Sequence, residues 1–216
     1  MVTNFTTSNS IVSEWMREIR DVGMQTDRMR FRRNMERIGE VAAYEISKYL
    51  SYEVVPVTTP LATTTCAVLA GQPVIATIFR AGMPLYQGIL NFFDQADSAF
   101  IGAYRKHAKD GSFEIAQQYV ASPALAGRPL IVADPMLATG ASMALAIESL
   151  LEYDQPSQMH IVAVIASKEG VDLMQQRFPG AHIWVGAIDN ELTNSKYILP
   201  GLGDAGDLAF GEKRQF

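Results

Sequence analysis

The sequence predicts an α/β fold, with a doubly wound, mostly parallel sheet and flanking helices. Short apolar runs typical of strands buried on both faces occur at 73–79, 130–133 and 159–166. Helical segments alternate with these runs, and this alternation favours parallel strands joined by crossover helices. Arginine closes two of the predicted strands, at the carboxyl edge where open α/β sheets bind their ligands.

Length and composition narrow the class of protein. We expect one domain over residues 1–216, because a chain with 48% hydrophobic and 19% charged residues can bury a proper core. The net charge of −5 disfavours a broad nucleic-acid face. The single Cys66 excludes an intrachain disulfide and fits a reducing compartment, and no Cys/His cluster suits a structural zinc ion. Without a signal-peptide core or a bilayer-spanning apolar run, we expect a cytoplasmic protein with no membrane partner.

The N-terminal quarter is expected to be helical after a loose arm at residues 1–10. Apolar spacing predicts a short helix over 11–24, and Asp27 is a candidate N-cap for a long helix to about Leu50. The two apolar stripes are Ile11, Trp15, Ile19 and Val22, then Phe31, Met35, Ile38, Ala42, Ile46 and Tyr49. The polar side of the long helix carries Arg28, Arg30, Arg32, Arg33 and Arg37. We interpret these arginines as a solvated face, with a subunit contact or an effector anion site as the alternative.

Two predicted strands end in arginine. Residues 73–79 are followed by Arg80, and the strand at 98–104 is followed by Arg105. A charged side chain at the end of a buried strand is costly unless it is paired. Because both strands end at the ligand-binding edge, we expect the two guanidinium groups to bind a polyanion, bidentately if it is a phosphate.

A flap is predicted beside these strand ends, at residues 105–123. Asp110 and Gly111 form a dipeptide typical of hairpin turns, and Phe113 to Val120 is the expected return strand. His107 lies in the flap and is a candidate general base, although a loop histidine is more simply explained as solvated.

The other expected elements need little comment. They are an edge strand at 53–58, an ambiguous stretch at 59–71, a helix from Pro84 to about Phe93, a helix at 169–178 and a strand at 182–187. His160 and His182 begin two strands, away from the expected ligand edge, and we interpret both as structural.

The stretch 129–142 has the strongest functional pattern. After the buried run, Asp134 and Pro135 end the strand, and a loop of small and hydroxyl residues leads into a helix. The residues that lead into the helix are Thr139, Gly140, Ala141 and Ser142, and Met136, Leu137 and Ala138 come before them. The free backbone N–H groups and the dipole of the helix suit a phosphate, while the Asp134 carboxylate can accept hydrogen bonds from sugar hydroxyls. An ordinary helix cap is the alternative interpretation.

The glycine-rich tail over 189–207 is the second informative region. Three glycines and a proline lie within Pro200 to Gly206, and glycine lets the backbone approach a ligand closely. Exposed backbone N–H and C=O groups could therefore recognise a flat, amide-like ring. The alternatives are an ordinary loop, or a calcium loop suggested by Asp204 and Asp207, although the EF-hand spacing is absent.

Together these stretches resemble the uracil phosphoribosyltransferase family. Asp134–Ser142 looks like the family's phosphoribosyl pyrophosphate loop, and Phe79–Met83 and Gly102–Arg105 look like its two arginine-bearing strand ends. Tyr197–Asp207 looks like its uracil-binding tail, and Phe210–Gly211 fits the family's chain end. The resemblance runs in order over about residues 10–211, and it implies a tail at 188–211 that forms a base-binding hood.

The resemblance implies transfer of 5-phosphoribosyl from phosphoribosyl pyrophosphate to N1 of uracil, giving UMP and pyrophosphate, with Mg²⁺ bound to the substrate. By position, Ala138 to Ser142 would hold the 5-phosphate, with the whole of Asp134–Ser142 forming the binding loop. Asp134 and Arg105 would be the catalytic residues, and Arg80 and Arg105 would bind pyrophosphate. The residues for uracil would be Ile198, Gly203, Asp204 and Ala205, with Asp204 also near phosphoribosyl pyrophosphate. A homodimer or larger homo-oligomer and a GTP effector would also fit the resemblance.

Departures from the family pattern leave alternatives open. The family loop commonly has glycine where Ala141 stands, so a positive φ at this position would strain the chain. The flap lacks the usual proline between Glu114 and Tyr119, and Met83–Pro84 replaces a further glycine after Arg80. The alternative functions are a non-catalytic or RNA-binding pyrimidine regulator on the same fold, and a phosphoribosyltransferase for another base.

Overall fold

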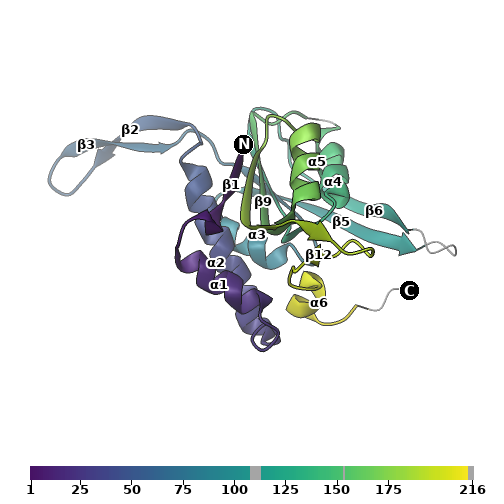
Figure 1. The fold of residues 1–216 in the computed structure, drawn as a ribbon. Helices are drawn as coiled ribbons and strands as arrows, with labels where there is room; N and C mark the ends of the chain where they lie inside the picture. Colours follow the sequence, from purple (N-terminus) through teal and green to yellow (C-terminus); the bar gives the residue numbers. More distant parts are fainter. Residues whose placement is uncertain (108–112, 153, 214–216) are drawn as a thin grey trace.

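The computed structural model of the chain describes residues 1–107, 113–152 and 154–213, with only the backbone described for residues 103–107 and 113–118. Its main sheet has the strand order β1-β10-β9-β7-β4-β5-β6, and β8 pairs with β9 (Figure 1). The pairs are parallel except the β5–β6 hairpin. The strands are β1 (Val2–Asn4), β4 (Val74–Phe79), β5 (Asp97–His107), β6 (Phe113–Ala121), β7 (Pro129–Ala133), β8 (Met136–Leu137), β9 (Gln158–Ser167) and β10 (His182–Asp189). The fold class predicted from the sequence is therefore confirmed.

Helices cover both faces of this sheet. The helices are α1 (Ile11–Arg20), α2 (Arg28–Ser47), α3 (Met83–Leu90), α4 (Ala141–Leu151), α5 (Lys168–Arg177) and α6 (Ala205–Phe210). Alternate strand residues point to opposite faces. Ile75 packs in the core beneath α1, α2 and α3, whereas Val74 packs in the core beneath α4 and α5. The two apolar layers explain the continuous apolar runs of the central strands.

The N-terminal arm is not loose, so that prediction is wrong. β1 adds a parallel edge strand to β10, and a 3₁₀ turn, η1 (Phe5–Thr7), follows it. Thr3 Oγ1 lies 2.8 Å from His182 Nε2, and the Phe5 ring stacks on Trp184. The polar sequence of this segment hid its strand because an edge strand is held chiefly by backbone hydrogen bonds, which any side chain permits.

The structure corrects the apolar face that we predicted for the first helix. It confirms the N-cap and the apolar face of the second helix. α1 buries Val12, Met16 and Ile19, whereas Ile11 and Val22 are exposed. α2 begins where the Asp27 side chain accepts a hydrogen bond from the backbone N–H of Arg30. The five stripe residues from Phe31 to Ile46 are buried, while Tyr49 is half-exposed beyond the end of the helix.

An arm projects from the body of the protein (Figure 1). It consists of β2 (Tyr52–Thr58) and β3 (Thr63–Leu69), which pair antiparallel with each other in a separate two-stranded sheet. The edge strand predicted at 53–58 is confirmed as β2, which has one free edge in this separate sheet. The interruption by Pro56 is tolerated because an isolated hairpin leaves the outer backbone groups open to water.

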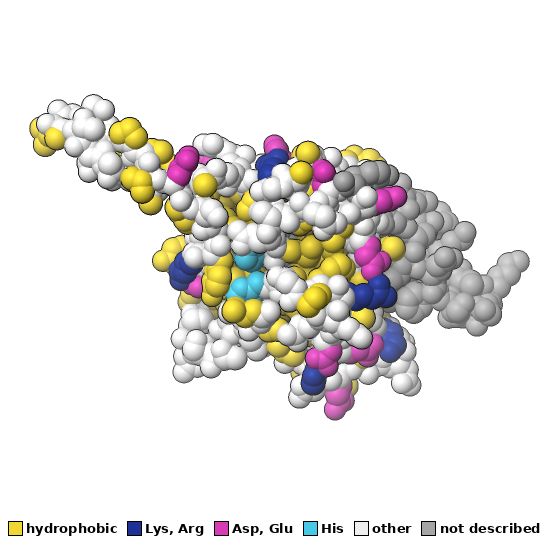
Figure 2. All heavy atoms as spheres, turned by 90° about the horizontal axis from the view of Figure 1, so that it is seen from above, with side chains coloured by type: hydrophobic (Ala, Val, Ile, Leu, Met, Phe, Trp, Pro, Cys, Tyr) yellow, Lys and Arg dark blue, Asp and Glu magenta, His cyan; other side chains and the backbone are white. Residues whose placement is uncertain are grey.

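His160 and His182 lie at the starts of β9 and β10, as the sequence indicates, and form part of an aromatic cluster. The Trp184 indole N–H donates to Nδ1 of His160 at 3.1 Å, and the His182 ring stacks on Trp184. Burial lowers the pKa of each imidazole to about 4. Figure 2 shows histidine side chains set among hydrophobic ones on this face. Neutral, packed rings fit the structural role that we assigned to them.

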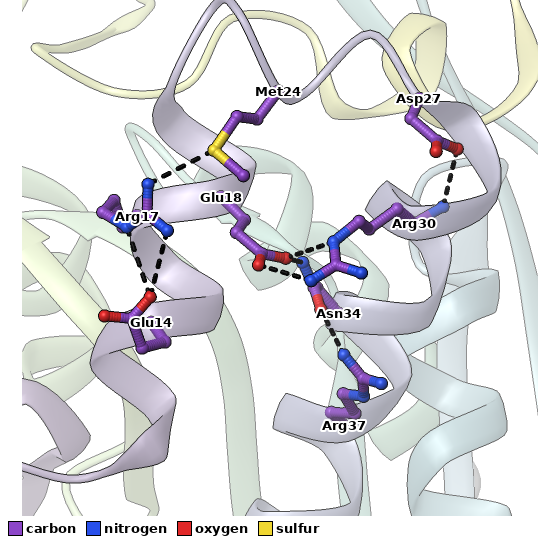
Figure 3. A network of polar contacts seen from close by, with 8 residues as sticks. All are labelled: Glu14, Arg17, Glu18, Met24, Asp27, Arg30, Asn34 and Arg37. Atoms are coloured by element: carbon purple, nitrogen blue, oxygen red, sulfur yellow. Dashed lines mark hydrogen bonds and ion pairs between the residues drawn. The ribbon is translucent and has the colours of Figure 1, made fainter.

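The arginines of α2 make specific contacts, which differs from the solvated face that we inferred. Arg30 donates to both carboxylate oxygens of the buried Glu18 on α1, at 2.7 and 2.6 Å, and Asn34 donates to the same group (Figure 3). Arg33 pairs with Glu36 and Glu40. Arg32 donates to the carbonyl oxygen of Ala209 in α6 at 2.7 Å. The partners of Arg30 and Arg32 lie on other helices, which spacing within α2 cannot reveal.

Replacing Glu18 by glutamine should lower the free energy of unfolding by about 1 kcal/mol, because a charge-assisted pair is lost while half-exposed Arg30 regains water. The hydrogen bonds from Arg30 and Asn34 lower the pKa of Glu18 to about 2. A depressed folded-state pKa stabilises the fold above pH 4.5, and this stabilisation disappears as the pH falls toward 2. Urea unfolding at pH 7 and pH 3 measures both effects.

Glu14→Gln is the matched control, since Glu14 makes an exposed pair with Arg17 on the same helix. Its effect should be near zero at both pH values. Equal effects of the two substitutions would contradict the assigned role of Glu18.

Candidate functional site

The carboxyl ends of β4 and β7 lie side by side, because these two strands pair from Val74↔Leu130 to Thr77↔Ala133. From β4 the chain passes to β5 on one side, and later to β7 on the other. Such a change of direction is the position at which doubly wound sheets bind ligands. The segments after β4 and β7 are those that contain Arg80 and Asp134.

The loop from Asp134 to Ser142 ends at the N-terminus of α4. Gly140 occupies the N-cap position with φ +81° and offers no side chain to the first turn of the helix. Ala141 is the first residue of α4 and is not among the residues with positive φ. The strain that alanine would suffer at positive φ therefore does not arise. α4 has 11 residues, and its N-cap residue makes no side-chain hydrogen bond to the first turn. Such a helix N-terminus suits a phosphate group.

The Asp134–Ser142 loop is held from behind by the start of α5. The Ser167 hydroxyl donates to the carbonyl oxygen of Ala138 at 2.6 Å and accepts from the backbone N–H of Gly170 at 2.9 Å. A Cβ atom on Gly170 would lie 2.4 Å from that same carbonyl oxygen. The loop thus rests directly on the backbone of α5. Ser167 was missed, although serine before a helix is an N-cap signal.

Asp134 follows the last residue of β7, and its backbone N–H donates to Val162 in β9 at 3.1 Å. Burial raises the pKa of its carboxyl group to about 7, and a hydrogen bond from the Met136 backbone offsets only part of that rise. A carboxylate that is poorly solvated in the free protein is well placed to accept hydroxyl groups or a cation from a ligand.

Arg80 is exposed and contacts the tail in this structure. Its guanidinium donates to Asp207 Oδ1 at 3.0 Å and to the carbonyl oxygen of Gly211 at 3.4 Å. The pairing that we expected for a charge at the end of a buried strand is therefore supplied by α6. Arg105 lies in β5, and its side chain is outside the described part of the chain, as is that of His107.

The tail forms a compact turn before α6. β11 (Glu191–Leu192) pairs with β12 (Ile198–Leu199), and Gly203 follows with φ +96°. Asp204 is the N-cap of α6 and accepts from the backbone N–H of Asp207 at 3.0 Å. Ile198 and Ala205 are buried, whereas Leu199 and Gly203 are exposed.

Lys213 contacts the predicted site residue Asp204, and sequence reasoning missed this lysine. Its ammonium group lies 2.7 Å from Asp204 Oδ2 and 3.6 Å from Asp207 Oδ1. Burial alone would raise the pKa of Asp204, but the hydrogen bond and charge of Lys213 and the Asp207 backbone hold it below its usual value. The sequence offered no signal for Lys213 because it follows the motif and has no regular spacing.

The predicted flap lies partly outside the described residues. The hairpin of the flap is confirmed by the pairing of β5 with β6 from Phe100↔Ala121 to His107↔Phe113. Its predicted turn at Asp110–Gly111 and its side chains before Tyr119 lie outside the described part.

This mostly parallel sheet with flanking helices, and with a strand–loop–helix unit at its carboxyl edge, has the type I phosphoribosyltransferase fold. The AQ2163 protein from Aquifex aeolicus has a similar solved structure, with a TM-score of 0.86, 27% identity and 98% of each chain covered. A family model described as uracil phosphoribosyltransferase matches residues 6–212. The chain belongs to the uracil phosphoribosyltransferase family, a family of enzymes that transfer pentosyl groups.

Curated relatives agree with that assignment. A uracil phosphoribosyltransferase from Porphyromonas gingivalis is 49% identical over 206 residues, which cover 95% of each chain. The uracil phosphoribosyltransferase of Pyrococcus furiosus is 38% identical over 93% of this chain and 86% of its own. Among the described residues, no helix has both the length and the apolar character that a membrane span requires.

Proposed function

We propose that the chain transfers the 5-phosphoribosyl group of phosphoribosyl pyrophosphate to N1 of uracil, releasing pyrophosphate and UMP, as in pyrimidine salvage. One observation carries the assignment of the site. Arg80, beside the phosphate loop, contacts Asp207 of the glycine-rich tail at 3.0 Å, so that the two regions meet at one sheet edge. A donor bound by the loop and a base bound by the tail would therefore be neighbours.

The phosphate loop binds the phosphoribosyl part of the substrate in this proposal. Residues 138–142 hold the 5-phosphate through backbone N–H groups and the dipole of α4. The Asp134 carboxylate accepts hydrogen bonds from the ribose hydroxyls, and its raised pKa supports that role, since a ligand donor replaces the missing solvent. Pro135, Met136 and Leu137 complete the loop, with β8 fixing it to β9.

The arginines stabilise the leaving group. Breaking the glycosidic bond builds positive charge on the sugar and negative charge on pyrophosphate, which preorganised guanidinium groups can neutralise. Arg80 must exchange Asp207 for the pyrophosphate, and Lys213 then remains to balance the Asp207 charge. We assign the second pyrophosphate contact to Arg105 by its position in the family motif.

Mg²⁺ enters with the substrate in this scheme. Magnesium in such sites is commonly held by one or two carboxylates together with phosphate oxygens of the substrate, and Asp134 is the carboxylate of the loop that fits. When bound, the ion would add positive charge beside the departing pyrophosphate.

Uracil is read mainly by backbone in this proposal. Ile198 and the turn Gly203–Ala205 offer N–H and C=O groups to the flat ring, because the positive φ of Gly203 turns its peptide groups away from regular structure. Asp204 would lie between uracil and phosphoribosyl pyrophosphate. The β5–β6 flap would exclude water, which would otherwise hydrolyse the donor.

A homo-oligomer is our proposal for the β2–β3 arm. An isolated two-stranded hairpin is at best marginally stable in water. Val54 and Leu61 are 72% and 97% exposed, and Figure 2 shows hydrophobic side chains along the projecting arm. A second copy of the chain, which offers the same apolar arm, would cover these residues.

Val54→Glu with Leu61→Glu should weaken self-association at least tenfold, because charges would then enter the shared surface. Sedimentation velocity over a dilution series measures this, with Val22→Glu, exposed in the α1–α2 turn, as control. An unchanged oligomeric state in the arm variant would contradict the proposal.

GTP is the effector that we propose. Three α2 arginines that could form an anion site already have partners in the structure. Arg30 pairs with Glu18, Arg32 donates to the carbonyl oxygen of Ala209, and Arg33 pairs with Glu36 and Glu40. For the location of the protein we propose the cytoplasm, because Cys66 is a free, exposed thiol of the kind that a reducing compartment preserves.

A base competition tests the proposed reaction. The protein is incubated with phosphoribosyl pyrophosphate, Mg²⁺ and equal uracil, cytosine and hypoxanthine, and the nucleotides are separated. We expect UMP alone, and loss of UMP when EDTA removes the metal. IMP as the main product would assign another base. Salt-dependent binding of RNA without any nucleotide product would favour the regulator.

A further inference from the structure

The tail at 188–211 is tied to the N-terminal helices by polar contacts that the reaction scheme does not use. Asp189, the last residue of β10, is 9% exposed. Its two carboxylate oxygens accept from the two terminal nitrogens of Arg20, at 2.9 and 3.0 Å. The same carboxylate accepts the backbone N–H of Gly201 at 2.9 Å. Arg20 therefore fixes the carboxylate that holds the middle of the tail.

Gln25 makes a second link from the turn between α1 and α2. Its side-chain amide donates to the carbonyl oxygen of Leu202 at 3.1 Å, and also to Ile19 at 3.0 Å. The Ile19 carbonyl belongs to the last turn of α1, where helices leave carbonyl groups without a partner. One amide thus connects the end of α1 with the tail residue that precedes Gly203.

The two tail residues that Asp189 and Gln25 contact, Gly201 and Leu202, are here called the braced residues, and the backbone is closely packed at Gly201. Gly201 has φ +63°, and a Cβ atom there would lie 2.1 Å from the carbonyl oxygen of Ile198. Gly201 and Leu202 lie between the two segments that we assign to uracil, Ile198 and Gly203–Ala205. Any shift of the braced residues would therefore move both segments relative to each other.

The helices that supply the brace are themselves fixed. Glu18 joins α1 to α2 through Arg30 and Asn34 (Figure 3). Arg32 of α2 donates to the carbonyl oxygen of Ala209, near the end of α6. The N-terminal helices thus contact the tail at its turn and at its terminal helix.

We propose that Arg20 and Gln25 are positioning residues for uracil, which act through the tail backbone and do not touch the base. The proposal rests on the assignment of uracil to the tail. A partly buried ion pair adds little net stability compared with apolar packing, but its bidentate geometry fixes direction. We therefore expect the pair to affect base binding more than folding.

Steady-state kinetics of Arg20→Met test this. KM for uracil should rise about tenfold, KM for phosphoribosyl pyrophosphate should change less than twofold, and Arg20→Lys should recover part of the loss. Arg17→Met on the same helix is the matched control and should leave both constants unchanged. A lower melting temperature with both KM values unchanged, or with both raised equally, would reduce Arg20 to a structural residue and overturn the proposal.

Two further variants keep the outcome decisive. Gln25→Leu leaves the charge intact and should also raise KM for uracil alone, so it decides the matter if Arg20→Met does not fold. Gly203→Val, which forces a branched side chain into positive φ, tests the tail itself. An unchanged uracil KM in Gly203→Val would contradict the tail assignment. A raised KM there, with Arg20→Met and Gln25→Leu unaffected, would contradict only the brace.

Discussion

Replacing Asp134 by asparagine should lower the rate of UMP formation about 100-fold while raising the melting temperature of the free protein at pH 8. The loss of activity follows because a neutral amide cannot accept the ribose hydroxyls as strongly, nor hold a metal cation. The gain in stability follows because burial of the carboxylate is costly in the absence of substrate. Activity and stability should thus change in opposite directions at one residue.

The sign of the stability effect is set by the raised pKa. The Asp134 carboxyl has a pKa of about 7 in the fold, against an ordinary value of 3.8. The folded chain therefore binds this proton more tightly than the unfolded chain does, and stability falls as the pH rises from about 4 to 7. Asparagine removes that loss, so the gain should be larger at pH 8 than at pH 5. Each 1 kcal/mol gained corresponds to about 3 °C in melting temperature.

Calorimetric scans at pH 5 and pH 8, with Asp172→Asn as control, measure the effect. Asp172 is an exposed carboxylate of α5 paired with Lys168, so its substitution should change stability little. In the wild type, kcat/KM for phosphoribosyl pyrophosphate should fall as the pH drops below about 7, since Asp134 then becomes protonated. A destabilised Asp134→Asn protein at pH 8 would contradict the buried-charge account.

Gly170→Ala should raise KM for phosphoribosyl pyrophosphate at least tenfold. Alanine normally favours a helix over glycine by about 1 kcal/mol. Here its Cβ would lie 2.4 Å from the Ala138 carbonyl oxygen and 2.6 Å from that of Leu137, which are backbone atoms of the phosphate loop. The loop would have to move away from α5, and its N–H groups would lose their alignment with the 5-phosphate.

The matched control is Gly180→Ala, because a Cβ there meets nothing within 4 Å and the φ angle is not positive. Both variants are assayed for KM of each substrate and for melting temperature. The control should behave as the wild type. A Gly170→Ala enzyme with unchanged KM for phosphoribosyl pyrophosphate would show that the contact with Ala138 does not position the loop.

Much of the architecture could be predicted because local pattern and global fold agree. The apolar side chains of β4, β7 and β9 are buried only when both faces of the sheet are covered, and the flanking helices cover both faces. Arg80 was proposed as a ligand-binding residue because a charged side chain that ends a buried strand is costly unless it is paired. Asp134 was proposed because it ends a buried strand beside a loop that leads into a helix.

The remaining features depend on contacts that no local pattern encodes. β1 is held by backbone pairing with β10, which lies about 180 residues away in the sequence. The partners of Arg30 and Arg32 lie on other helices, so both looked solvated. Lys213 gains its place only when α6 brings Asp204 and Asp207 together. These charge pairs thus depend on the tertiary structure.

In the proposed enzyme, the loop after β7 and the tail form one active site. Product analysis of three proteins, with phosphoribosyl pyrophosphate, uracil and Mg²⁺, tests this most directly. We predict equal amounts of UMP and pyrophosphate from the wild type, and a loss of about 100-fold in Asp134→Asn. Ala205→Leu should raise KM for uracil while still binding phosphoribosyl pyrophosphate. Wild-type rates in both variants, or no UMP from the wild type, would contradict the account.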